Sequence, residues 1–314
     1  MSTTLLGVAF ISFIGLFLFR KLTRYIGLMD IPNLRKAHSK PTPLAGGLAI
    51  FSTILTCYIF GLYHLDGFDL FITLSAILVI VSAIDDKYDI SVWLRLSIQA
   101  IVSLVLIKQS NLYLHDLGNL IGGGFIHLPV FSGYIITILG IIGAINAFNM
   151  VDGIDGLLGG LAIVSISAIS YLFAINNQPD LMVLCFTYIA ALLPYVMMNL
   201  GIPFGSKFKI FMGDAGSVFI GFSIIWLILN ASQSDTLHSI RPVTALWIIA
   251  VPLMDMVVTM IRRIRKGHSP LKPDREHIHH MFQRLGFSST KTLIVLCLIA
   301  YAMAAIGIWG QVNN

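Results

Sequence analysis

Charged side chains are scarce in this chain of 314 residues. Asp, Glu, Lys and Arg together make up 11% of it, whereas 57% of the residues are hydrophobic. A soluble domain carries about 25% charged residues, so this composition excludes a water-soluble globular protein. The mean hydropathy of +0.87 indicates that the lipid bilayer is the solvent for most of the fold.

Cysteines are few and basic residues are lacking at the N-terminus, and each of these features excludes a further kind of site or segment. Only three cysteines are present, far apart and in apolar runs, which excludes a disulfide framework and a CxxC metal or redox site. The first four residues carry no basic side chain, and Arg20, Lys21 and Arg24 follow the apolar segment 4–19. A secretion signal has the opposite order. This segment is therefore expected to be a first membrane span with its N-terminus outside.

Long apolar stretches are what the chain does have. They run over 4–19, 44–63, 69–84, 92–107, 131–148, 157–175, 181–200, 215–231, 243–261 and 291–311. About 18 mostly apolar residues suffice for a transmembrane helix, and no long hydrophilic run separates the stretches. The sequence predicts one all-α, polytopic membrane domain over residues 1–314, with about ten transmembrane helices.

The basic residues predict the orientation of these helices. With the N-terminus outside, eighteen of the twenty Lys and Arg residues fall in the cytoplasmic connections, and only Lys108 and Arg241 fall outside. Cytoplasmic loops carry such an excess. Ten of the fifteen acidic residues map to the same cytoplasmic face. Among these, Asp89 and Asp255 are interpreted as charges at helix ends.

Four polar motifs interrupt the apolar pattern at this face. They are AIDDKYD around Asp85 and Asp86, NAFNMVDGIDG with Asn149, Asp152 and Asp155, FMGDAGS with Asp214, and DREHIHH with Arg275, His277, His279 and His280. An aspartate at mid-bilayer costs about 3 kcal/mol, so the five aspartates would together cost on the order of 15 kcal/mol in lipid. They are expected to line a wet cleft and to be functional.

The residue types in these motifs indicate phosphate chemistry. Carboxylate and amide oxygens suit Mg²⁺ or Mn²⁺, and on a helix the spacing of Asn149, Asp152 and Asp155 would place them on one face. The histidines lack the i, i+4 pair of a zinc-binding helix and, beside Arg275, are better suited to holding phosphates. The sequence predicts metal-assisted phosphoryl transfer with a lipid-borne substrate. The alternative of a cation-coupled transporter is disfavoured, because transporters place such residues near the midplane in paired repeats.

These strings, over essentially the whole chain, resemble the polyprenyl-phosphate N-acetylhexosamine-1-phosphate transferase family. The resemblance implies transfer of a sugar 1-phosphate from a UDP-sugar to a polyprenyl phosphate, with release of UMP. The peptidoglycan branch typically has an uninterrupted triple histidine, whereas Ile278 splits the run here. This favours the branch that uses UDP-N-acetylglucosamine and undecaprenyl phosphate to prime O-antigen or enterobacterial common antigen. A sibling for teichoic acid or peptidoglycan lipid I remains the alternative.

The resemblance also implies roles for individual residues. Asp214 and Asn149 look like metal ligands for Mg²⁺, or Mn²⁺, with Asp152 and Asp155 close by, and Asp85 and Asp86 like the pair that acts on the lipid phosphate. Substrate-binding roles fall on Lys40, Arg95, Phe211, Arg275, His277, His279 and His280. The expected location is the bacterial cytoplasmic (inner) membrane, with the active site facing the cytoplasm. No nucleic acid is expected as a partner, and a homo-oligomer is left open.

Overall fold

The computed structural model describes residues 2–32, 40–119, 124–234, 239–271 and 276–313. The first helices are α1 (Ser2–Tyr25), α2 (Gly46–Ile59), α3 (Phe68–Tyr88), α4 (Val92–Ser110), α5 (Val130–Val151) and α6 (Leu157–Ile175). The later ones are α7 (Pro179–Asn199), the 3-10 turn η1 (Ser206–Phe208), α8 (Asp214–Gln233), α9 (Pro242–Ile248), α10 (Ala250–Arg265), α11 (Ile278–Arg284) and α12 (Ser289–Asn313). Two short antiparallel strands, β1 (Met29–Asp30) and β2 (Thr42–Pro43), are the only strands in the described ranges.

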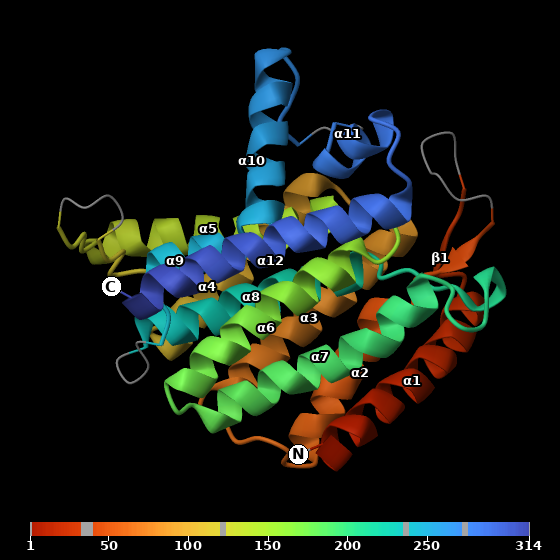
Figure 1. The fold of residues 1–314 in the computed structure, drawn as a ribbon, viewed down its shortest axis with the longest axis horizontal. Coiled ribbons are helices and arrows are strands. Elements are labelled where there is room, and N and C mark those ends of the chain that lie inside the picture. Colours follow the sequence, from red (N-terminus) through yellow and green to blue (C-terminus); the bar gives the residue numbers. More distant parts are fainter. Residues whose placement is uncertain (1, 33–39, 120–123, 235–238, 272–275, 314) are drawn as a thin grey trace.

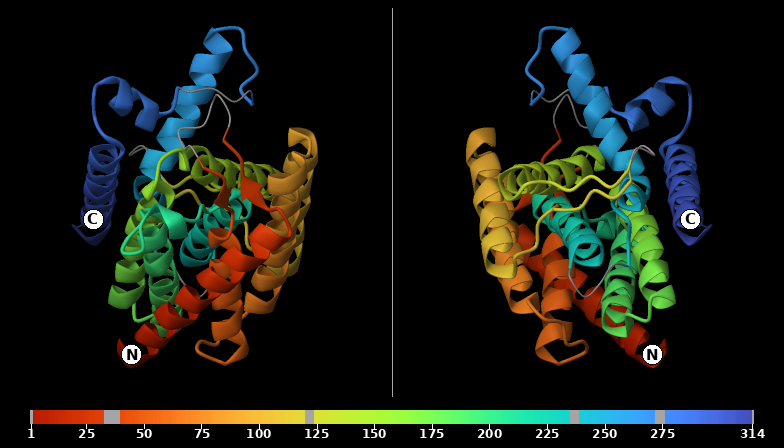
Figure 2. Two further views of the ribbon diagram at one scale, coloured as in Figure 1. Left: turned by 90° about the vertical axis from the view of Figure 1, so that its right-hand side faces the viewer. Right: turned by 90° about the vertical axis from the view of Figure 1, so that its left-hand side faces the viewer.

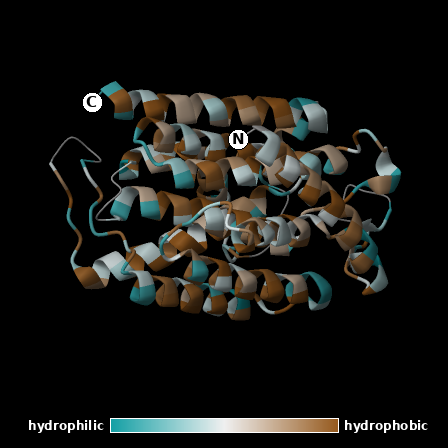
Figure 3. Ribbon diagram, turned by 90° about the horizontal axis from the view of Figure 1, so that it is seen from below, coloured by the Kyte–Doolittle hydropathy of each residue, from teal (hydrophilic) through white to brown (hydrophobic). Residues whose placement is uncertain are grey.

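The all-α prediction is confirmed, and the helices fit a multi-pass membrane protein. Within the described residues, eight helices are long and apolar enough to cross a membrane, and the bent pair α9–α10 would be a ninth. The stretch 44–63 forms α2, which has 14 residues and is about 21 Å long, shorter than a hydrocarbon core of about 30 Å. In Figure 1, α12, α6, α7 and α1 run side by side. Apolar residues cover the middle of the bundle, and many of the hydrophilic ones lie toward its two ends (Figure 3).

Helix α8 is the centre of the bundle. Helices α2, α3, α5 and α6 pack around it, and almost all of its residues are buried. Close approach depends on small residues: a Cβ added at Gly216 would lie 2.7 Å from the Cα of Gly47, and one at Gly221 would lie 2.8 Å from the Cα of Ile145. Small residues allow helix backbones to approach in this way. Protein rather than lipid therefore surrounds α8.

The predicted span 243–261 is not one straight helix. Helices α9 and α10 meet at Ile249 with a bend of 80°, and Figures 1 and 2 show α10 leaving the bundle at a steep angle to α12. Pro252 has no N–H to donate to the carbonyl of Ile248, four residues earlier. The hydroxyl of Ser165 donates to that carbonyl instead, at 3.0 Å. The freed backbone acceptor is thereby satisfied inside the membrane domain.

Candidate functional site

The polar motifs meet at one end of the bundle, around the N-terminus of α8. Asp85 and Asp86 lie in the last turn of α3, Arg95 in the first turns of α4, Asn149 at the end of α5, and Asp214 is the first residue of α8. Figure 1 shows α11 and β1 at this same end. The predicted gathering of these residues at one face of the bundle is therefore observed.

Asp86 caps helix α8 from a distance of 128 residues in the sequence. Its carboxylate accepts hydrogen bonds from the backbone N–H groups of Asp214, at 2.9 Å, and Ala215, at 3.3 Å. The N-terminus of a helix carries partial positive charge and unpaired N–H groups, so a carboxylate is stabilised there. Gly213 has φ +73°, and a Cβ there would lie 2.7 Å from an Asp86 oxygen. Glycine at 213 is thus required for this cap.

Arg95 joins two of the carboxylates. Its Nη1 donates to Asp85 at 2.6 Å and to Asp214 at 3.2 Å. Asp85 is buried and also accepts the backbone N–H of Ile90 at 2.9 Å. The side chain of Arg95 is 34% exposed. It can therefore compensate the two acids and still reach an anionic substrate.

The amide of Asn149 is oriented by two hydrogen bonds. Its nitrogen donates to Asp214 at 3.0 Å and to the hydroxyl of Ser217 at 2.8 Å. Both bonds use the nitrogen, so the amide oxygen keeps its lone pairs for a cation or a polar ligand. One turn deeper, Asn146 donates to Gln99 at 2.9 Å and ties α5 to α4.

Asp152 and Asp155 lie in a turn rather than on a helix. Helix α5 ends at Val151, and residues 152–156 form turns that finish at Gly156, where φ is +78°. The extension of one helical face from Asn149 to Asp155 is therefore wrong, because Gly153 and Gly156 end the helix before it. Asp152 is exposed to solvent at its surface, but protein surrounds its carboxyl group on the other sides. Desolvation by the surrounding protein, then repulsion from Asp214 and Asp155, raises the pKa of Asp152 to about 7.

Asn199 holds this turn in place. Its side-chain oxygen accepts the N–H of Gly156 at 2.6 Å, and its nitrogen donates to the carbonyl of Ile210 at 2.8 Å. Lys209 forms an ion pair with Asp155 at 2.5 Å and lies 5.2 Å from the centre of the Phe211 ring. The turn with the two aspartates is thus tied to the segment that carries Phe211.

The segments of Lys40 and Phe211 also meet. The N–H of Phe211 donates to the carbonyl of Pro43 at 2.9 Å, and the Thr42 hydroxyl donates to the carbonyl of Lys40 at 3.1 Å. The N–H groups of Gly46 and Gly47, at the start of α2, donate to the carbonyls of Phe211 and Met212, each at 3.0 Å. The predicted substrate-binding positions 40 and 211 therefore share one border of the site.

The histidine motif covers the aspartate turn. His279 is buried, and a Cβ added at Gly153 would lie 2.1 Å from its Nε2. Burial, and then repulsion from His280 and His277, lowers the pKa of His279 to about 3, which keeps the ring neutral. His277 faces Asp255 on α10. Arg275, predicted to bind substrate, lies outside the described residues.

The donor types and the charge of the site fit a divalent cation. Five carboxylates (Asp85, Asp86, Asp152, Asp155 and Asp214) are grouped with Arg95 and Lys209. Carboxyl groups thus outnumber cationic side chains here, and such an excess of oxygen donors favours cation binding. Within the described ranges, however, no three His, Cys, Asp or Glu side chains form a ready-made cage. Asp214 and the amide oxygen of Asn149 are the suitable donors, and a substrate's phosphate oxygens would have to complete the coordination.

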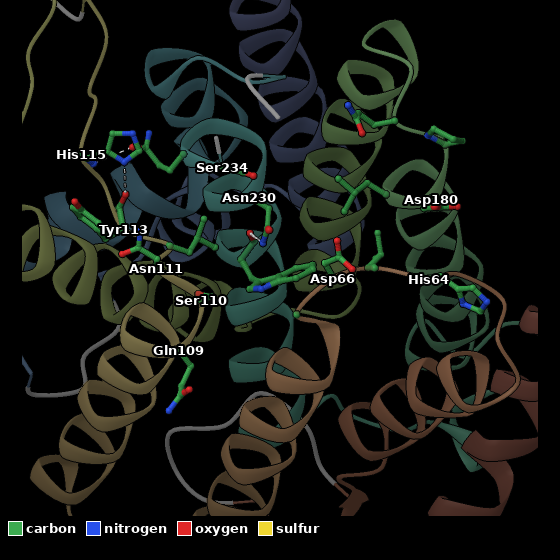
Figure 4. Close-up of a pocket in the computed structure, with 18 residues that line it drawn as sticks. His64, Asp66, Gln109, Ser110, Asn111, Tyr113, His115, Asp180, Asn230 and Ser234 are labelled. Carbon is green, nitrogen blue, oxygen red and sulfur yellow. Dashed lines mark hydrogen bonds between the residues drawn. The ribbon is translucent and has the colours of Figure 1, made fainter. Parts of the chain in front are cut away.

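A larger cavity than the one at this site lies elsewhere. About 820 Å³ opens at the opposite end of the bundle, near the end of α4 and the start of α7 (Figure 4). Its lining includes His64, Gln109, Asp180 and Asn230, and none of the predicted site residues. A cavity of about 20 Å³ lies among Asp85, Arg95, Asn149 and Asp214. Converging charged groups identify a reaction site better than volume does, so the smaller cavity marks the candidate site.

The sequence profile of glycosyl transferase family 4 matches residues 68–232. This segment holds the carboxylates, Arg95, Asn149 and Phe211 described above. The chain belongs to glycosyl transferase family 4. Relatives named undecaprenyl-phosphate alpha-N-acetylglucosaminyl 1-phosphate transferase include those of Escherichia coli K12 and Pasteurella multocida. The first is 46% identical over 315 residues, covering all of this chain and 84% of the relative, and the second is 47% identical over 306 residues, covering 96% and 85%.

A third relative with this name, from Salmonella typhi, is 47% identical over 312 residues, covering 99% of this chain and 84% of the relative. The family resemblance inferred from the motifs is therefore confirmed. Sequence reasoning did not assign Asn199 or Asp255 to the site. It interpreted Asp255 as a charge at a helix end, which is wrong because Asp255 lies inside α10. Asn199 is a single amide at the end of an apolar helix, and Asp255 lies in an apolar run, so neither position carries a motif that would single it out.

Proposed function

We propose that this protein transfers N-acetylglucosamine 1-phosphate from UDP-N-acetylglucosamine to undecaprenyl phosphate and releases UMP. The observation that carries the proposal is the junction at the start of α8, where Asp85, Arg95, Asn149 and Asp214 meet beside an anchored carboxylate. Relatives that match over the whole chain carry the corresponding name. The product would be the lipid-linked primer for O-antigen or enterobacterial common antigen.

The reaction joins the lipid phosphate to the sugar-proximal phosphorus of the donor. A lipid phosphate oxygen forms the new O–P bond, the bond from that phosphorus to the bridging oxygen breaks, and UMP leaves with that oxygen and its electron pair. The second pKa of a phosphate monoester is about 6, so the acceptor is largely dianionic and needs no strong base. Arg95 and Lys209 would orient phosphate oxygens, and Phe211 would stack on the uracil ring.

A divalent ion, Mg²⁺ or Mn²⁺, held by Asp214 and Asn149 with Asp152 and Asp155 close by, would neutralise charge on the phosphate oxygens. Asp85 and Asp86 would position the lipid phosphate, since each is itself fixed by hydrogen bonds. Lys40 would bind on the nucleotide side, and Arg275, His279 and His280 on the side of the sugar diphosphate. The runner-up donor specificities are those of the teichoic acid and lipid I siblings.

The fate of a labelled phosphate tests this reaction. With label in the sugar-proximal phosphate of UDP-N-acetylglucosamine, the label should enter the lipid as a polyprenyl diphosphate sugar. A donor labelled in the uridine-proximal phosphate is the matched control, and its label should leave as UMP. An ordinary glycosyl transfer would break the sugar–oxygen bond and keep both labels in UDP. Label recovered in UDP would reject the proposal.

We further propose that the chain crosses a bacterial inner membrane about ten times, with the N-terminus outside and the site facing the cytoplasm. Cysteine labelling tests it after Cys57, Cys185 and Cys297 are replaced. Ser206 is exposed beside the site, and His64 is exposed at the other end of the bundle. A cysteine at 206 should react only with a reagent supplied to the cytoplasmic side, and a cysteine at 64 only with one supplied outside. The reverse pattern would overturn the orientation.

A further inference from the structure

A buried network joins α10 to the histidine motif. Asp255 lies in the middle of α10, and its Oδ2 is 2.9 Å from Nδ1 of His277, while its Oδ1 accepts the backbone N–H of Ile278 at 2.7 Å. On the other edge of the His277 ring, Nη2 of Arg263 approaches Nε2 to 3.5 Å. Arg263 also donates to the carbonyl of Pro270 at 2.7 Å. Asp255, His277 and Arg263 are each more than nine-tenths buried.

The network fixes the proton on the ring of His277. An arginine side chain can only donate, so the nitrogen that faces Arg263 has to accept, and the hydrogen lies on Nδ1. That hydrogen is donated to Asp255. A carboxylate in this position sets the tautomer and the orientation of a histidine ring. Both nitrogens of His277 therefore face protein groups rather than the cleft.

From His277 the contacts lead to the aspartate turn. The rings of His277 and His279 are parallel within 4°, with their centres 5.8 Å apart. His279 rests against Gly153, between Asp152 and Asp155 in the sequence, and the absence of a Cβ there is what admits its Nε2. Asp255 also caps α11 through Ile278, immediately before His279. A shift of Asp255 would thus be transmitted to the turn.

We infer that Asp255, His277 and Arg263 are positioning residues that hold His279 against the turn of Asp152 and Asp155, and that His277 does not bind the substrate. The inference rests on the proposed transfer reaction. It gives His277 a positioning role in place of the substrate-binding role expected from its motif. A buried ion network adds little net stability, because its desolvation offsets its attraction, whereas loss of one member leaves the others unpaired. Such a network is suited to fixing a geometry.

Steady-state kinetics of Asp255→Asn test the inference. The substitution keeps the shape but leaves one acceptor oxygen for two donors, so kcat should fall about 10- to 100-fold, the usual effect of removing an outer partner of a functional histidine. The KM for UDP-N-acetylglucosamine should change by less than about twofold, because no substrate contact is removed. Glu276→Gln is the matched control, since it neutralises the neighbouring carboxylate, which pairs with the exposed Lys266; it should keep kcat within about twofold.

Two replacements of His277 separate the roles of its nitrogens. The amide nitrogen of asparagine reaches the place of Nδ1, whereas that of glutamine reaches the place of Nε2. His277→Asn should therefore retain at least about tenfold more activity than His277→Gln, and adding Asp255→Asn to His277→Gln should cause little further loss, because the pair acts as a unit. A raised donor KM with unchanged kcat, a more active glutamine variant, or fully additive losses would overturn the inference.

Nitrogen NMR of ¹⁵N-histidine-labelled protein supplies a readout that does not depend on turnover. One ring, identified by its loss in His277→Asn, should show hydrogen on Nδ1 in the native protein, and this signal should change in Asp255→Asn but not in Glu276→Gln. An unchanged signal in Asp255→Asn would overturn the network. If the native protein failed to transfer N-acetylglucosamine 1-phosphate, the proposed function would be rejected. The spectrum would still show whether Asp255 fixes the hydrogen on Nδ1 of His277.

Discussion

Asp214→Asn should reduce turnover by about 10²- to 10³-fold, the loss typical when one electrostatic contact to a transition state is removed. Asp214 accepts hydrogen bonds from Arg95 and Asn149, and it is the carboxylate that we propose to hold a divalent ion together with the Asn149 oxygen. An amide can neither balance the charge of Arg95 nor bind a hard cation as strongly. Turnover should be measured with purified protein over a Mg²⁺ series.

The variant should nevertheless fold. Loss of the charge removes a favourable contact with the α8 N-terminus, about 0.3–1 kcal/mol, but it also relieves repulsion from Asp85 and Asp86. Asp180→Asn is the matched control, because Asp180 occupies the first turn of α7 at the opposite end of the bundle. It should keep native turnover. Near-native activity of Asp214→Asn with an unchanged Mg²⁺ dependence would reject the proposed role in metal binding.

Gly47→Ala should destabilise the protein by about 3 kcal/mol, the upper end of the usual effect of overpacking. Its new Cβ would lie 2.2 Å from the backbone nitrogen of Gly216 and 2.3 Å from its Cα. Backbone atoms cannot turn aside as a side chain can, so α2 and α8 would have to separate. The hydrogen bond from Gly47 to the carbonyl of Met212 would be strained, and Asp214 would shift with its helix. Thermal inactivation in detergent measures the loss.

Gly140→Ala provides the comparison for this prediction. Gly140 lies in α5, and a Cβ there would meet nothing within 4 Å, so the alanine should be neutral or stabilise the helix by up to about 1 kcal/mol. Equal thermal stability of Gly47→Ala and Gly140→Ala would show that the contact between α2 and α8 is not tight.

The gathering of the site residues could be predicted because their motifs stand out in an apolar chain. Asp85, Asn149 and Asp214 each end or begin a long apolar stretch at the same face, and charge in lipid is costly enough to require a shared cleft. Which of these side chains contact one another could not be predicted. That Asp86 caps α8, rather than Asp85, depends on how two helices separated by more than 100 residues are rotated.

The position of Asp255 illustrates what depends on tertiary structure. In the sequence, Asp255 is a single acidic residue before a basic run, and this pattern favoured its interpretation as a charge at a helix end. The bend at Ile249 turns α10 out of the bundle, and Asp255 then lies behind the histidine motif, where it contacts His277. Pro252 alone does not predict an 80° bend, because prolines occur in the first turn of straight helices. The bend also involves Ser165, 83 residues away in the sequence, whose hydroxyl donates to the carbonyl of Ile248 that Pro252 leaves without its usual helix donor.

The enclosure of α8 has a consequence for biogenesis. Helices α3 and α5 already flank α8 in the finished bundle, and both precede it in the sequence, so they are available as the chain emerges and α8 enters the membrane. Its polar residues, among them Ser217 and Ser223, find partners on those neighbours and on α7, as the bonds from Asn149 and Tyr188 show. Because α8 begins with Asp214, the step that inserts the central helix also delivers the central carboxylate. Chains in the membrane that have not yet inserted α8 should therefore be inert.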